Sequence, residues 1–143
     1  MLLAVILTLC GCGSEMPFNG EVSFHELSVT VPDKFVRDST KSSQDAWVFE
    51  RGWYEEMIIL TRSDITGAVT MEDYMLSMQE VGAQVTATTF LGNEAVHSAY
   101  TKDGQYCQEM FFAYNGSFYA VALRGGTVEE FQQLLDTVTI EEA

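Results

Sequence analysis

Residues 101–126 read TKDGQYCQEMFFAYNGSFYAVALRGG, and this stretch contains two tight turns between apolar runs. The turns are Asp103-Gly104 and Asn115-Gly116. Asp-Gly and Asn-Gly between apolar runs are the strongest short-range signals of a β-hairpin, because both turn residues tolerate positive φ. The stretch therefore predicts antiparallel strands at 105–114 and 117–124.

Two further strands are predicted upstream, at 86–91 and 95–101, with Gly92-Asn93 as the turn between them. Together with 105–114 and 117–124 they form a meander of four antiparallel strands. Phe111-Phe112 and residues 120–123 do not alternate between apolar and polar. A strand that is apolar on both sides is typical of a sheet covered on both faces.

A helix is predicted on each side of the meander. Thr70 is a suitable N-cap that Asp73 answers in a variant of the capping box, and Gly82 ends this first helix. Thr127 and Glu130 form a full capping box for the second helix. The apolar residues at helical spacing are Met71, Tyr74, Met75, Met78 and Val81 in the first helix and Val128, Phe131, Leu134 and Leu135 in the second. We interpret both stripes as core-facing, with a pliable methionine binding face as the alternative for the first.

The N-terminal half of the chain predicts three more strands, at 26–32, 46–50 and 54–61. Pro32 ends the first of these strands, and Arg51-Gly52 is the turn between the other two. The polar segment 33–44 is expected to be a loop held by Phe35, and the tail 137–143 is expected to add an edge strand through Val138 and Ile140.

These elements predict an α+β fold. We expect an antiparallel sheet of about six or seven strands with a helix on each face, which is a three-layer α/β/α sandwich.

The first twelve residues, MLLAVILTLCGC, resemble a bacterial lipoprotein signal peptide. The apolar run is too short to span a bilayer but suits a signal peptide. Leu9-Cys10-Gly11-Cys12 places an aliphatic residue and then a small residue before Cys12, as the lipoprotein signal peptidase requires. Cleavage between Gly11 and Cys12 would leave Cys12 as the N-terminus, carrying diacylglycerol and palmitate. One departure is that Met1-Leu2-Leu3 lacks the usual Lys or Arg, and the alternative is a buried N-terminal strand.

The resulting domain prediction is a signal peptide at 1–11, a lipid-anchored tether at 12–20 and one α+β domain at 21–143. The protein is then expected on the extracytoplasmic side of a bacterial cell membrane, held there by the lipid on Cys12. Cys107 would be the remaining cysteine, and its apolar surroundings predict a small buried hydrophobe. A catalytic thiol is the alternative, although no neighbouring positive charge would lower the pKa of Cys107.

The chain is acidic, with 21 Asp and Glu against 7 Lys and Arg and a formal net charge of −14. Binding to nucleic acid depends on basic patches that neutralise phosphates. We therefore expect no nucleic-acid partner, and we attribute the charge to solubility.

The sequence contains few residues in patterns typical of catalytic, cofactor-binding or metal sites. His25 and His97 lack the partners at metal-ligand spacing that a zinc site needs. The sequence has no GxSxG elbow and no glycine-rich phosphate loop. The turn 124–127 could hold an anion through backbone amides, but a turn leading into an N-cap is the simpler interpretation. We predict no catalytic residue, no cofactor and no metal site.

Aromatic residues gather around the Arg51-Gly52 turn and form the one candidate binding surface. They are Trp47, Phe49, Trp53 and Tyr54. Trp, Tyr and Arg dominate the hot spots of protein interfaces, so an exposed turn would make Trp53, Tyr54 and Trp47 a partner-binding patch. A buried turn would make them core residues. Trp53 is nearest the turn and is expected to be the most exposed.

The order of elements along the chain resembles the PsbP-like superfamily. The resemblance rests on Val31-Pro32-Asp33 with Phe35 after the opening strand, then two strands, a helix, the meander and a closing helix, and it covers roughly residues 22–141. Small bacterial lipoproteins look similar. The resemblance implies a binding or assembly factor for other proteins and no enzyme, and it carries no catalytic residues.

Three functions are compatible with the sequence. The first is a non-enzymatic accessory that binds or helps assemble another envelope protein, which requires an exposed patch. The second is a small-molecule or sugar-binding lipoprotein, which requires a concave site lined by aromatic rings. The third is a hydrolase, which requires titratable groups that converge in a cleft.

Overall fold

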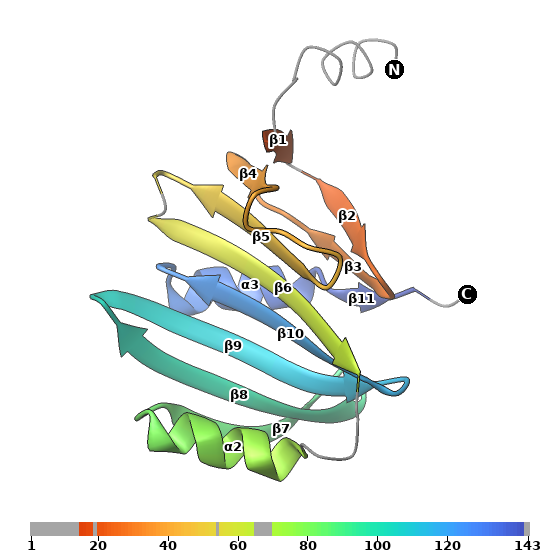
Figure 1. The fold of residues 1–143 in the computed structure, drawn as a ribbon, viewed down its shortest axis with the longest axis vertical. Coiled ribbons are helices and arrows are strands. Elements are labelled where there is room, and N and C mark those ends of the chain that lie inside the picture. Colours follow the sequence, from red (N-terminus) through yellow and green to blue (C-terminus); the bar gives the residue numbers. More distant parts are fainter. Residues whose placement is uncertain (1–14, 19, 54, 65–69, 142–143) are drawn as a thin grey trace.

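The computed structural model describes residues 15–18, 20–53, 55–64 and 70–141. Gly11, Cys12 and Tyr54, which the sequence analysis singled out, lie outside these residues. These residues form two antiparallel sheets and two helices (Figure 1). The larger sheet has eight strands in the order β1-β4-β5-β6-β10-β9-β8-β7. In chain order these are β1 Glu15–Phe18, β4 Phe35–Asp38, β5 Ala46–Arg51, β6 Glu56–Asp64, β7 Gln84–Phe90, β8 Asn93–Lys102, β9 Gln105–Tyr114 and β10 Ser117–Arg124.

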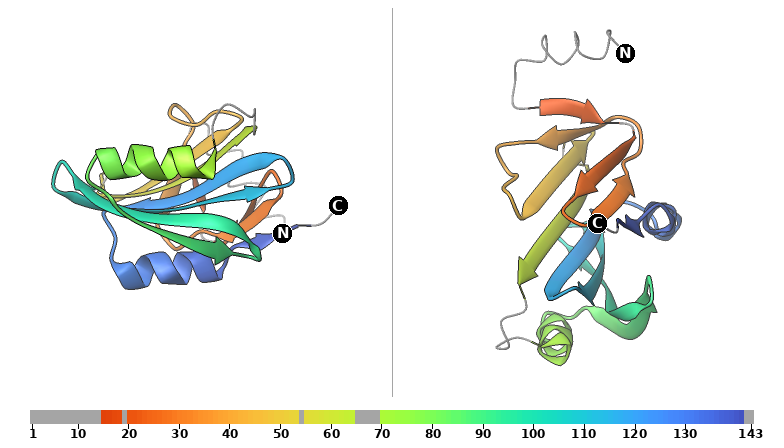
Figure 2. Two further views of the ribbon diagram at one scale, coloured as in Figure 1. Left: turned by 90° about the horizontal axis from the view of Figure 1, so that it is seen from below. Right: turned by 90° about the vertical axis from the view of Figure 1, so that its right-hand side faces the viewer.

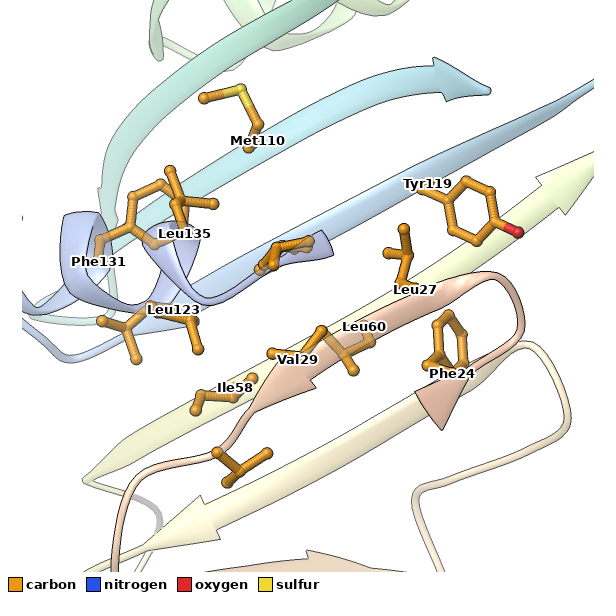
Figure 3. Packing of buried hydrophobic residues seen from close by; sticks show 14 of the residues in the cluster. Phe24, Leu27, Val29, Ile58, Leu60, Met110, Tyr119, Leu123, Phe131 and Leu135 are labelled. Atoms are coloured by element: carbon orange, nitrogen blue, oxygen red, sulfur yellow. The ribbon is translucent and has the colours of Figure 1, made fainter. Parts of the chain in front are cut away.

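A smaller sheet of three strands joins the N-terminal part of the domain to the C-terminus. Its order is β11-β3-β2, with β2 at Glu21–Phe24, β3 at Leu27–Thr30 and β11 at Thr139–Ile140. Phe24, Leu27 and Val29 of this sheet pack with Ile58 and Leu60 of β6 in the main apolar core (Figure 3).

The helices α2, Met71–Glu80, and α3, Val128–Asp136, pack against different sets of strand residues. The α3 side chains Phe131, Leu134 and Leu135 belong to the main core together with Ala95 and Tyr119. Met71 of α2 belongs to a second cluster with Val96 and Phe118. Neighbouring residues on a strand point to opposite faces, so the two clusters lie on opposite faces of the larger sheet (Figure 2).

The α+β class and the four-strand meander are confirmed. The turn predicted at Gly92-Asn93 lies one position earlier, at Leu91-Gly92, because Asn93 begins β8 and pairs with Phe90. The predicted layering is revised. The strands form two sheets, and the small sheet and α3 together cover one face of the large sheet. Three short strands were not predicted. β4 falls in the expected loop 33–44, β1 falls in the expected tether 12–20, and β2 precedes the first predicted strand. Each is four residues long, too short to show a clear period.

Both predicted helix starts are confirmed, with complete capping boxes at Thr70–Asp73 and Thr127–Glu130. The predicted burial is wrong for two residues of the apolar stripes. Val81 is 70% exposed because it is the C-cap of α2, and Val128 is 57% exposed because it begins α3. Among the described residues, no helix is long and apolar enough to cross a membrane.

Candidate functional site

Arg51, the last residue of β5, connects three parts of the domain. Its Nε donates to Glu56 Oε1 at 2.9 Å, and its Nη2 contacts the same carboxylate. Nη1 donates to the carbonyl oxygen of Asp33 at 3.0 Å, and Nη2 lies 3.5 Å from Glu130 Oε2. The guanidinium also lies 4.3 Å from the centre of the Phe35 ring. Arg51 therefore ties the β5–β6 hairpin to β4 and to the first turn of α3.

An inner hollow of about 320 Å³ opens on one side of Arg51. Its apolar lining comes from Phe35, Ile58, Leu123 and Leu134, and its polar rim includes Glu56 and Glu130. The guanidinium is already paired with both carboxylates, which leaves the rim with an excess of negative charge. Such a site does not favour an anionic ligand.

An outer hollow of about 290 Å³ lies on the other side of Arg51. It is lined by Lys34, Val36, Asp38, Glu50, Arg51, Gly52 and Trp53. Asp38 Oδ1 accepts hydrogen bonds from Thr40 N at 2.9 Å and Thr40 Oγ1 at 2.5 Å, so this carboxylate also stabilises the turn after β4.

The pKa values of Asp38 and Glu50 shift in opposite directions. The hydrogen bond from Glu50, followed by those from Thr40, lowers the pKa of Asp38 to about 2. Burial, followed by the hydrogen bond to Asp38, raises the pKa of Glu50 to about 7, and the ammonium of Lys41, 3.5 Å from Glu50 Oε2, opposes that rise.

Trp53 lies at the edge of the outer hollow and is 93% exposed. Its φ of +56° is a left-handed conformation that bulky residues rarely adopt. Gly52 (φ +69°) and Lys34 (φ +74°), which also line the hollow, share this conformation. So do four residues in other turns of the chain, His25, Leu91, Asp103 and Asn115. Left-handed non-glycine residues cost about 1–3 kcal/mol each and concentrate at functional sites.

The other predicted aromatic residues occupy different environments. Trp47 is half-buried, with its ring 5.2 Å from Phe24 and the Arg37 guanidinium 4.1 Å from its centre. Phe49 is fully buried in the main core. The structure thus separates the predicted cluster: Phe49 is core, Trp47 packs on the core, and Trp53 is on the surface.

The two histidines have separate partners. His25 Nε2 lies 3.0 Å from Asp45 Oδ1 and 2.9 Å from the carbonyl oxygen of Gln44. His97 lies 5.9 Å from the Phe131 ring, and burial lowers its pKa. The described ranges contain no group of three His, Cys, Asp or Glu that could hold a metal ion.

The structure also shows the surroundings of Cys107 and of the turn 124–127. Cys107 is buried, as expected of a small hydrophobe. In the turn 124–127, Gly125 N donates to Tyr106 O and Thr127 N donates to Glu130 Oε1. Because both amides already have acceptors within the protein, neither is available to bind an anion.

Sequence reasoning missed Arg51 as a connecting residue and missed the Asp38–Glu50 pair. The partners of Arg51 lie 5 and 79 positions away in the chain, and Asp38 was placed in a loop. No local pattern in the sequence indicates either contact.

Comparisons with solved structures establish the fold. No protein-family model and no curated protein matches this chain. Cyanobacterial PsbP (CyanoP) from Synechocystis sp. PCC 6803 matches with a TM-score of 0.60 at 13% identity, over 91% of this chain and 95% of that chain. PA94 from Pseudomonas aeruginosa matches with a TM-score of 0.52 at 14% identity, over 92% of this chain and 100% of that chain.

A Bacteroides thetaiotaomicron protein matches with a TM-score of 0.54 at 10% identity, over 91% of this chain. This chain spans 49% of that protein, about half of its length. These likenesses show that the fold is PsbP-like, as the element order predicted.

Proposed function

We propose that this chain is a non-enzymatic binding protein on the extracytoplasmic side of a bacterial cell membrane. Lipid on Cys12 anchors it, and it binds or helps assemble another envelope protein. The observation that carries this proposal is Trp53, which is 93% exposed in a left-handed conformation. Exposure of a large indole and positive φ both have a free-energy cost, and a partner that buries the indole offsets both.

Several features support a binding role for the surface around Trp53. Arg51, which precedes Gly52 and Trp53, is held by Glu56 and Asp33. Preorganised aromatic anchors lose little conformational entropy on binding. The PsbP-like fold is compatible with this role but is not evidence for it, since a fold alone does not specify function.

Anchoring would keep this surface near the membrane. Two residues, Gly13 and Ser14, lie between Cys12 and Glu15, the first residue of β1, so the chain from Cys12 to Glu15 spans roughly 10 Å when extended. β1 pairs with β4, which pairs with β5, so the strands beside Trp53 belong to the end of the sheet nearest the anchor. A membrane-associated protein is therefore the favoured partner.

A sugar or small-molecule ligand is the second candidate. The outer hollow favours it, because an exposed indole beside the Asp38–Glu50 pair and Lys34 combines a stacking surface with hydrogen-bonding groups. This candidate predicts that a ligand remains bound to the protein through purification.

The protein-partner proposal is tested by crosslinking in cells followed by mass spectrometry, comparing the wild type with Trp53→Ala and Trp53→Gly. We expect one envelope protein to be captured by the wild type and lost by at least tenfold in both variants. Neither should unfold at a lower temperature, and Trp53→Gly should be at least as stable as the wild type because glycine removes the strain at φ +56°.

Val128→Ala is the matched control, since it removes another exposed apolar side chain, on α3. It should retain the partner. A large loss of stability in Trp53→Ala would make Trp53 a core residue and refute the proposal. Equal capture by wild type and Trp53→Ala would also count against it.

A further inference from the structure

The outer edge of β7 is an unpaired strand edge. β7 is the last strand of the large sheet and pairs with β8 in an uninterrupted register from Gln84 to Phe90. Among the described strands, none pairs with its other side. Five of its seven residues are exposed, and its outer edge is visible between α2 and α3 (Figure 2, left), although α2 packs against one face of β7 through Met71 and Val85. Such an edge presents free N–H and C=O groups that can accept another strand.

β7 lacks the features that normally protect a strand edge. Its sequence, QVTATTF, has no charge, no proline and no bulge. The other edges differ: β1 carries Pro17 and Glu15, β2 begins with Glu21, and β11 has two residues. Charges, prolines, bulges and short length are the usual defences against pairing with another chain. β7 is thus the long edge of this domain that remains open to pairing.

A groove accompanies this edge. It has a volume of about 600 Å³ and lies between α2 and the paired strands β7 and β8. Met71 and Met75 supply adaptable apolar surface, and Glu72 and Glu94 supply exposed carboxylates. A strand added to β7 would place every second side chain on the face of the sheet on which this groove lies.

The charge around the groove indicates what kind of strand would fit. Between Arg62 and Lys102 the chain contains no Lys or Arg. The same segment contains Asp64, Glu72, Asp73, Glu80 and Glu94. A basic segment would be attracted to this region. A second copy of this chain would be repelled, because each copy has a net charge of −14 and two β7 edges would bring both acidic regions together.

We propose that β7 and the groove beside α2 bind an extended basic segment of another protein. The segment pairs with β7 as an additional strand and places Lys or Arg side chains beside Glu72 and Glu94. This surface is independent of Trp53, since β5 and β7 are separated by four strands in the sheet. β7 also lies at the opposite end of the sheet from β1 (Figure 1), so a protein anchored near β1 would keep it accessible.

The test uses a fluorescent eight-residue peptide of alternating lysine and valine and the full chain, with binding followed by fluorescence anisotropy. We expect saturable binding that weakens with salt, and no binding of the matching glutamate–valine peptide. The double variant Glu72→Gln/Glu94→Gln should bind about three- to tenfold more weakly at low salt. The control Glu129→Gln/Asp136→Asn removes the same charge from exposed positions on α3 and should bind like the wild type.

Two further measurements separate strand pairing from simple charge attraction. N-methylation of one set of alternate peptide amides should abolish binding, while methylation of the other set should not, because only one edge of the peptide pairs with β7. Trp53→Ala should leave the affinity for the peptide unchanged. The proposal for Trp53 and the proposal for β7 can therefore be refuted independently. The proposal is overturned if the peptide does not bind, if both methylated peptides bind equally, or if the full chain sediments as a dimer that excludes the peptide.

Discussion

At the scale of single residues, the most informative positions are the ones that local rules disfavour. Trp53 is an exposed aromatic residue with positive φ, and Asp38 and Glu50 are two carboxyl groups whose pKa values shift in opposite directions. Both features lie on the outer hollow beside Arg51. Strain and unusual protonation at one place are typical of a site whose geometry serves binding more than stability.

Glu50 should make the stability of the protein depend on pH near neutrality. The pKa of Glu50 is about 7 in the folded state, above its ordinary value of 4.5, so the protonated form stabilises the fold. This contribution is complete below about pH 4.5 and is lost as pH rises through 7. Asp38 acts in the opposite direction, and its contribution is lost as pH falls toward 2. We expect the wild type to lose a few degrees of Tm between pH 5.5 and 8.5 that Glu50→Gln does not lose.

Thermal unfolding of the two proteins across this pH range checks the prediction. Subtracting the Glu50→Gln curve removes the contributions of other groups, such as Glu109, whose pKa is raised by burial. Parallel curves for the two proteins would show that Glu50 does not hold the proton.

At the scale of elements, α2 and α3 begin with the same capping box but contribute differently to the core. Phe131, Leu134 and Leu135 of α3 are buried in the main cluster, whereas Met71 is the one described residue of α2 that is fully buried. The Glu130 side chain also makes two contacts, since Oε1 caps α3 by accepting from Thr127 N and Oε2 lies near Arg51. The start of α3 is therefore part of the candidate site as well as of the core.

Removing the two N-caps should thus have unequal effects. Thr127→Ala should lower the free energy of unfolding by about 1 kcal/mol or more, because it breaks the cap and releases Glu130. Thr70→Ala should cost less, because α2 can open locally without exposing the main core. Urea unfolding gives the global free energy, and hydrogen exchange of the α2 amides reports local opening. Equal losses in both variants would mean that α2 is as firmly held as α3.

At the scale of the whole molecule, the sheet has two ends with different properties. The β1–β4–β5 end carries Trp53 and is closest to the expected anchor, and the β7 end carries an open strand edge in an acidic region. An arrangement of this kind suits a protein that contacts one partner near the membrane and another away from it. Lipid on Cys12 would set that orientation.

Membrane attachment is therefore the decisive whole-molecule prediction. Cys12→Ala should move the protein from the membrane fraction to the soluble fraction, because the lipid-accepting sulfur is lost. Cell fractionation and immunoblotting measure this, and mass spectrometry of the wild type should show an acylated N-terminal Cys12. A Cys12→Ala protein that remains with the membranes would contradict the lipid anchor.

Features that depend on neighbours a few positions apart could be predicted from the amino-acid sequence. The Asp103-Gly104 and Asn115-Gly116 turns, the meander strands and both capping boxes all form as predicted. Turn and cap energies come from backbone groups within about four residues, so residue types at fixed offsets are enough to specify them.

Features that depend on residues far apart in the chain could not be predicted and become visible only in the folded domain. β4 is a strand because β1 and β5 pair with it, and Arg51 becomes a connecting residue because Glu130 lies beside it across 79 positions. Val81 and Val128 are exposed although their spacing fits the apolar stripes, because the ends of a helix extend beyond the surface that its middle covers. The open edge of β7 likewise follows from strand order, which is set by packing of the whole sheet and not by any local pattern.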